Sequence, residues 1–184
     1  SSTDHNLEAP LADKRRPQSL DEVIGQHHLL DEGAPLQNMI SSGIFSSLIL
    51  WGPPGVGKTT IARLLAEHSK SHFEQLSAIF TGVSDLKKVF EAAKIRRTNG
   101  HKTIIFVDEI HRFNKSQQDS FLPFLEDGTI TLIGATTENP SFELNSSILS
   151  RVQVLVLERF TYTKLERRFD RAERLLGSQS NLEL

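Results

Sequence analysis

The stretch Gly52-Pro53-Pro54-Gly55-Val56-Gly57-Lys58-Thr59 decides the fold of this 184-residue chain. It matches the pattern G-x-x-x-x-G-K-[ST], whose glycines let backbone N–H groups close around phosphate oxygens. An apolar run of strand length precedes it at residues 48–51, and a segment with apolar residues at helical spacing follows it. Because strand, glycine-rich turn and helix occur in this order, the sequence predicts a phosphate-binding loop.

Each polar side chain of this loop has a predicted role. Lys58 is expected to meet the β- and γ-phosphates of a nucleotide, and Thr59 to offer its hydroxyl to Mg²⁺, which prefers oxygen ligands. We therefore predict that ATP or ADP binds here together with Mg²⁺. The predicted nucleotide contacts in this segment are Gly52, Pro53, Pro54, Gly55, Val56, Gly57, Lys58, Thr59 and Thr60.

A second apolar run, residues 103–107, ends in two adjacent carboxylates, Asp108 and Glu109. In a parallel sheet such a strand delivers both groups to the edge where the phosphate-binding loop also lies. Asp108 is expected to contact Mg²⁺, directly or through water, and Glu109 to orient and activate the attacking water. An acid-rich helix N-terminus would explain one of these carboxylates, but not their pairing with a phosphate-binding loop.

Strand-length apolar runs alternate with helix-length segments along the chain, which predicts a parallel sheet covered by helices. A helix is expected from Ser84 to an end at Asn99 and Gly100, and another over residues 116–126 that should kink or end at Pro123. A charged helical stretch is expected at residues 164–176. The predicted strands are residues 48–51, 73–77, 103–107, 130–135 and 152–157.

Composition narrows the possible classes of protein. A content of 38% hydrophobic and 24% charged residues suits one compact domain. We expect an intracellular protein without a membrane span, because no run approaches about 20 apolar residues and the first ten residues do not read as a signal peptide. The absence of cysteine excludes disulfides and thiolate zinc sites. A net charge of -2 gives no general attraction to nucleic acid, so DNA contacts must come from local groups. The candidates are Lys87, Lys88, Lys94, Arg112 and Lys115.

Two further blocks, residues 108–119 (DEIHRFNKSQQD) and 134–142 (GATTENPSF), resemble the AAA+ ATPases of the RarA/MgsA type, the Werner-helicase-interacting family. The similarity covers nearly all of residues 11–157. It implies a five-stranded parallel sheet in the order 5-1-4-3-2, flanked by helices. The nucleotide-binding core would span residues 17–158, after an N-terminal arm at residues 1–16 and before the beginning of a truncated helical lid at residues 159–184.

The resemblance also implies roles for residues outside the phosphate-binding loop. Thr137 would sense the γ-phosphate, with Thr136 as the second choice and a hydroxyl that only satisfies the turn as the alternative. Arg151, in a Ser-Arg pair similar to the arginine-finger motif of clamp loaders, would reach the ATP of a neighbouring subunit. Residues 16–26 resemble the clamp-loader segment around the adenine. In that segment the base would be bordered by Val23, Ile24 and Gly25.

By the same resemblance, the expected function is Mg-dependent ATP hydrolysis by a DNA-directed ATPase in replication-fork maintenance, recombination or repair. Expected partners are DNA junctions or gaps, single-stranded DNA-binding protein, replisome components and other copies of the chain. The expected location is the cytoplasm, the nucleoid or, in a eukaryote, the nucleus.

Three other functions stay open from the sequence. Residues 108–111 also match the D-E-x-H box of helicases, although 184 residues accommodate two RecA-like domains poorly. A small-molecule kinase would share the phosphate-binding loop. A nucleotide-gated scaffold with slow hydrolysis is the third alternative, against which the presence of both Glu109 and Arg151 argues.

Overall fold

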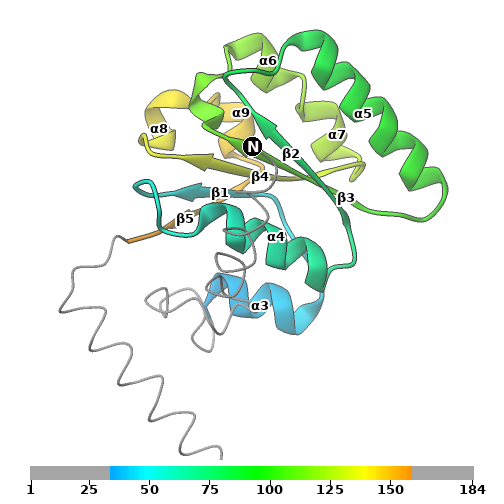
Figure 1. The fold of residues 1–184 in the computed structure, drawn as a ribbon, viewed down its shortest axis with the longest axis horizontal. Helices are drawn as coiled ribbons and strands as arrows, with labels where there is room; N and C mark the ends of the chain where they lie inside the picture. The colour runs from blue at the N-terminus through cyan, green and yellow to red at the C-terminus, as the bar shows by residue number, and fades with distance from the viewer. Residues whose placement is uncertain (1–33, 159–184) are drawn as a thin grey trace, which may run out of the picture.

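The computed structural model describes residues 34–158, whose centre is a five-stranded parallel sheet (Figure 1). The strands lie in the order β2-β3-β4-β1-β5, and every hydrogen-bonded pair is parallel. This order confirms the predicted 5-1-4-3-2, counted from the other edge, and all strand bounds fall within one residue of prediction. The strands are β1 (Leu48–Trp51), β2 (His72–Ser77), β3 (Thr103–Asp108), β4 (Thr131–Thr136) and β5 (Gln153–Val156).

Helices cover both faces of this sheet. Helices α3 and α4 lie against one face, and the remaining helices lie on the other (Figure 1). Within residues 34–158 no helix has the length and apolar character that crossing a membrane requires. The helices are α3 (Pro35–Ser42), α4 (Lys58–His68), α5 (Val83–Thr98), the short 3-10 helix η2 (Ile110–Arg112), α6 (Lys115–Asp119), α7 (Leu122–Glu126), α8 (Pro140–Glu143) and α9 (Ser146–Leu149).

Side chains alternate between two apolar layers along the central strands. On β1, Leu48 and Leu50 pack into the layer under α3 and α4, whereas Ile49 packs into the layer under α5 and its neighbours. On β3, Phe106 and Val107 divide between the same two layers. Successive strand residues point to opposite faces, so a strand covered on both sides needs an unbroken apolar run. The packed sheet therefore positions the loops and strand ends that lie at its edge.

The helix predicted over residues 116–126 is in fact two helices, α6 and α7, and the expected kink or end at Pro123 is wrong. Helix α7 begins at Leu122, so Pro123 occupies its first turn, where a missing N–H has no helical acceptor to lose. The break lies earlier, between the two helices. Helix α6 begins with a reciprocal cap, in which Asn114 accepts from the backbone N–H of Gln117 at 2.8 Å and donates its own backbone N–H to the Gln117 side chain at 3.0 Å.

The helix predicted from Ser84 is confirmed as α5, which begins one residue earlier and ends beside Asn99. Several predictions fall outside the described residues: the N-terminal arm, the lid with its helical stretch at 164–176, and the adenine contacts Val23, Ile24 and Gly25.

Candidate active site

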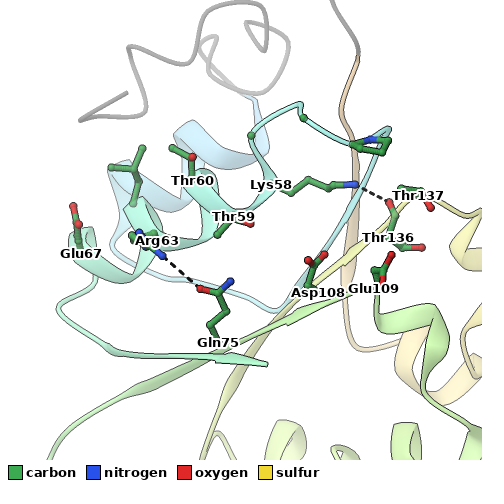
Figure 2. Close-up of a pocket in the computed structure, with 14 residues that line it drawn as sticks. Lys58, Thr59, Thr60, Arg63, Glu67, Gln75, Asp108, Glu109, Thr136 and Thr137 are labelled. Carbon is green, nitrogen blue, oxygen red and sulfur yellow. Dashed lines mark hydrogen bonds between the residues drawn. The ribbon is translucent and has the colours of Figure 1, made fainter. Parts of the chain in front are cut away.

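A cleft of about 910 Å³ opens at the carboxyl edge of the sheet (Figure 2). The loop after β1, helix α4 and the ends of β3 and β4 form most of its wall. This volume lies in the range of small-molecule sites. The cleft is lined by Pro54, Gly55, Gly57, Lys58, Thr59, Thr60, Arg63, Leu64, Glu67, Gln75, Asp108, Glu109, Thr136 and Thr137.

The predicted phosphate-binding loop makes a tight turn that side chains would obstruct. Gly55 and Gly57 have φ angles of +79° and +97°, a region that L side chains rarely adopt. A Cβ on Gly52 would lie 2.7 Å from the carbonyl oxygen of Leu157, the residue that follows the edge strand β5. Gly52 and Val56 are buried behind the lining, and Gly57 directly precedes α4. The free N–H groups that open α4 therefore adjoin the cleft, ready for an anion.

Lys58 is held across the floor of the cleft. Its Nζ donates to the carbonyl oxygen of Gly52 at 2.5 Å and to that of Thr136 at 3.4 Å. Burial lowers the pKa of Lys58, and the nearby carboxylates Asp108 and Glu109 partly offset this by favouring the charged form. Carbonyl dipoles orient the ammonium, and among residues 34–158 no carboxylate forms a direct salt bridge with it. The position is therefore suited to a polyanionic ligand.

Asp108 and Glu109 stand side by side at the end of β3, with both carboxylates directed into the cleft (Figure 2). Glu109 has a left-handed backbone, with φ +54° and ψ +46°. This conformation costs a residue other than glycine about 1–2 kcal/mol. The backbone N–H of Arg112 donates to the Glu109 carbonyl at 2.9 Å and closes the turn. The strained turn ends the strand abruptly, and Glu109 comes to lie beside the end of β4.

The two threonines at the end of β4 have different surroundings. Thr136 is 2% exposed, its Oγ1 lies 2.9 Å from Nδ1 of His111, and it accepts the backbone N–H of Glu138 at 3.0 Å. Thr137 is exposed and lines the cleft. Its hydroxyl is thus the one that a ligand can reach, which favours Thr137 over Thr136 as the phosphate sensor.

Arg151 lies at the opposite edge of the sheet. It precedes β5, which runs parallel to β1, so it belongs to the amino edge and is not among the cleft-lining residues. Its guanidinium donates to the carbonyl oxygen of Ser147 at 2.7 Å and pairs with Glu126 at 2.5 Å. Glu126 and Arg151 are both partly exposed. Arg151 therefore lies outside its own cleft, in an ion pair at the protein surface.

The oxygen donors in the cleft fit magnesium that arrives with a nucleotide. Among residues 34–158 no group of three or more His, Asp or Glu side chains could hold a metal ion. Thr59 and Asp108, however, line the same cleft with a hydroxyl and a carboxylate. Mg²⁺ commonly takes only one or two protein ligands and completes its shell with water and phosphate oxygens. These two residues would hold it in that way.

Three residues at the far end of the cleft were not predicted from the sequence: Arg63, Glu67 and Gln75. The guanidinium of Arg63 donates to the Gln75 side chain at 3.4 Å (Figure 2) and lies 5.8 Å from the ring centre of Phe73. Arg63 follows Thr59 by four residues and Glu67 follows Arg63 by four, so helical spacing could have found both. Gln75 is recognisable only once β2 is known to lie beside β3.

A glycine-rich phosphate-binding turn between a strand and a helix defines P-loop nucleotide-binding domains. Here that turn follows β1, and the paired carboxylates come from β3, two places away in the same sheet. Comparison with known proteins agrees. Residues 48–159 match the family described as ATPase family associated with various cellular activities (AAA).

Relatives of known name narrow the family further. The chain is 53% identical over 161 residues to replication-associated recombination protein A of Escherichia coli, covering 88% of this chain and 36% of that protein. It is 40% identical over 163 residues to the protein of the same name from Bacillus subtilis, covering 89% and 38%. The RuvB Holliday junction branch migration motor of Thermotoga maritima superposes with a TM-score of 0.65 at 30% identity, covering 88% and 55%. The chain therefore belongs to the AAA family of ATPases, in the branch of the replication-associated recombination proteins.

Proposed function

We propose that this chain is the ATP-hydrolysing core of a DNA-directed AAA+ ATPase that acts in replication-fork maintenance, recombination or repair. The main support for this proposal is that Lys58, Asp108 and Glu109 line one cleft beside a helix N-terminus. Family membership supports ATP as the nucleotide, and the names of the relatives support the process. The chain spans about a third of the length of those relatives, so substrates and partners of the whole protein belong to this proposal.

In the proposed reaction each residue of the cleft has one task. Lys58 and the N–H groups of the loop bind the β- and γ-phosphates. Thr59 and Asp108 would hold Mg²⁺, which neutralises phosphate charge when it is bound. Glu109 accepts a proton from the attacking water at its carboxylate, while the Thr137 hydroxyl helps to orient the γ-phosphate and that water. By family resemblance, the adenine is bordered by Val23, Ile24 and Gly25.

Arg151 is proposed to act on the ATP of a neighbouring copy. Its place at the amino edge keeps it out of its own cleft, and its pairing with Glu126 holds it at the protein surface. An arginine supplied in trans can accelerate phosphoryl transfer by about 10³ to 10⁵. Hydrolysis in this scheme requires a homo-oligomer, because no single copy contains a complete site.

Mixing two inactive variants in an assembled form of the protein tests whether Glu109 and Arg151 act from different copies. Arg151→Ala and Glu109→Gln should each hydrolyse ATP very slowly. Mixed oligomers should recover activity, because an intact Glu109 from one copy then meets an intact Arg151 from the next. Arg97→Ala, which removes another exposed arginine paired with an acid at 3.7 Å, is the matched control and should leave activity unchanged. Mixed oligomers that form without recovering activity would disprove the role in trans.

The rate of ATP hydrolysis, measured with and without DNA, separates the proposed function from its alternatives. A small-molecule kinase would need a small phosphoryl acceptor, and a scaffold would bind ATP without hydrolysing it. The match of residues 48–159 to the AAA family gives the helicase alternative no support. Within this proposal, single-stranded DNA-binding protein and replisome components are expected partners, and the protein is expected where the chromosome lies. If single-stranded, gapped and forked DNA all leave the rate of hydrolysis unchanged, the proposal that the ATPase is DNA-directed is wrong.

A further inference from the structure

The short helix η2, which follows the Glu109 turn, lies against β4 through two of its side chains. Ile110 is 2% exposed, and a Cβ on Gly134 would lie 2.8 Å from its Cδ1. The next residue, His111, places its Nδ1 2.9 Å from the hydroxyl oxygen of Thr136. Gly134 and Thr136 are two residues apart on one strand, so both point to the same face. One close apolar approach and one hydrogen bond thus hold η2 on β4.

Thr136 connects this contact to the phosphate-binding loop and to Thr137. Its carbonyl oxygen accepts the backbone N–H of Gly52 at 3.0 Å and the ammonium of Lys58 at 3.4 Å (Figure 2). Its hydroxyl accepts the backbone N–H of Glu138 at 3.0 Å. A threonine hydroxyl that bonds the backbone two residues later closes a local turn, and here Thr137 lies inside that turn. The position of Thr137 therefore depends on where the Thr136 hydroxyl is held.

The contact between His111 and Thr136 is chemically compatible with either protonation state of the ring. The Thr136 hydroxyl accepts the Glu138 N–H and has one hydrogen of its own to donate. Nδ1 of a neutral imidazole can accept this hydrogen at 2.9 Å, a shorter contact than the Glu138 carbonyl offers at 3.3 Å. A protonated ring would instead donate to the hydroxyl. Because Thr136 is 2% exposed, solvent does not readily take the place of His111.

The backbone ladder that joins β3 to β4 ends before it reaches the catalytic groups. Its last paired residues are Val107 and Gly134. Glu109 lies two residues beyond this end on one strand, and Thr137 lies three residues beyond it on the other. The hydrogen bond between the imidazole and the β4 hydroxyl lies past the last ladder pair. This side-chain bond therefore joins the two strand ends where the ladder no longer does.

We propose that His111 is a positioning residue for ATP hydrolysis, which acts through Thr136 to fix the Glu109 carboxylate relative to the Thr137 hydroxyl. In the proposed reaction Glu109 takes a proton from the attacking water that Thr137 helps to orient, and a displacement of about 1 Å can slow such a step by about a hundredfold. His111 is not among the described residues that line the cleft, so its loss should spare nucleotide binding. This inference rests on the proposed ATP hydrolysis and adds a residue to it.

Steady-state hydrolysis by the assembled protein, with MgATP affinity from calorimetry, tests the positioning role. His111→Ala should lower kcat about ten- to hundredfold and leave the affinity near that of the wild type. His111→Asn should recover part of the rate, because its amide can also bond the hydroxyl. Thr136→Val should be slow as well, and the double variant should be no slower than Thr136→Val alone, because one bond is lost in both. His101→Ala, an exposed histidine after α5, is the matched control and should change neither quantity.

Mixed oligomers show on which side of the site His111 acts. His111→Ala should recover activity when mixed with Arg151→Ala but not when mixed with Glu109→Gln, because His111 and Glu109 serve the same cleft. The reverse pattern would overturn the inference, as would a wild-type kcat for His111→Ala or a loss of MgATP affinity as large as the loss of kcat. Any of these results, with Glu109→Gln still slow, leaves the proposed function intact. Near-normal hydrolysis by Glu109→Gln would overturn both.

Discussion

The backbone strain at Glu109 should be measurable as a reversal of the usual preference for alanine over glycine. At φ +54° and ψ +46° Glu109 has a left-handed conformation, which costs residues with a Cβ about 1–2 kcal/mol. Glycine avoids this cost but loses about 0.4–1 kcal/mol through its more flexible unfolded chain. The difference between the mid-points of these ranges predicts a free energy of unfolding about 0.8 kcal/mol higher for Glu109→Gly than for Glu109→Ala. Both variants lack the carboxylate, so side-chain effects largely cancel.

Urea unfolding of the chain measures this difference. Lys87, exposed within α5, supplies the control position. There Lys87→Gly should be less stable than Lys87→Ala by about 1 kcal/mol, the ordinary helix ranking. If alanine is the more stable replacement at Glu109 as well, the turn is not strained, and the explanation of how it places the carboxylate beside β4 is refuted.

Three other changes have definite expected outcomes. Lys58→Ala should abolish useful MgATP binding in calorimetry, because the phosphate charge loses its ammonium partner; unchanged affinity would defeat the assignment. Gly52→Ala should lower the free energy of unfolding by about 1–3 kcal/mol, because its Cβ would meet a backbone oxygen at 2.7 Å. In the same denaturation assay Gly82→Ala, whose Cβ has no neighbour closer than 3.6 Å, should be tolerated. Hydrogen bonds from Thr129 lower the pKa of Asp127 below its usual 3.8. The ionised carboxylate therefore stabilises the fold above that pH, and this stabilisation is lost as the pH falls through the folded-state pKa. Asp127→Asn should accordingly flatten the loss of stability below about pH 4, and an unaltered pH profile would count against that bond.

The three central strands of the sheet, β1, β3 and β4, could be predicted from the sequence because they are covered on both faces. Residues 104–107 form an unbroken apolar run, and they are buried in the structure together with Thr103, so the strand was recognisable without knowing its neighbours. The phosphate-binding loop could be predicted for a related reason. Gly55 and Gly57 have positive φ angles, and a Cβ at Gly52 would lie too close to a backbone oxygen. Few residues other than glycine fit these positions, so the loop can be recognised from its glycines.

Features that depend on tertiary contacts could not be predicted. Pro123 has the same chemistry inside a helix as in its first turn, and only the packing of α7 decides which position it occupies. Helices α8 and α9 are too short to show periodicity. Thr136 and Thr137 differ because the Thr136 hydroxyl contacts His111, which is 25 residues away in sequence. Local sequence patterns do not reveal this contact.

Glu109→Gln in the assembled protein tests the proposed chemistry most directly. The amide keeps the shape of the side chain but cannot take a proton from water, so MgATP affinity in calorimetry should stay near that of the wild type. Steady-state hydrolysis should fall by at least about a hundredfold. Glu91→Gln, an exposed carboxylate on α5, should change neither quantity. Near-normal turnover by Glu109→Gln, at full nucleotide affinity, would contradict the assignment of Glu109 as the base.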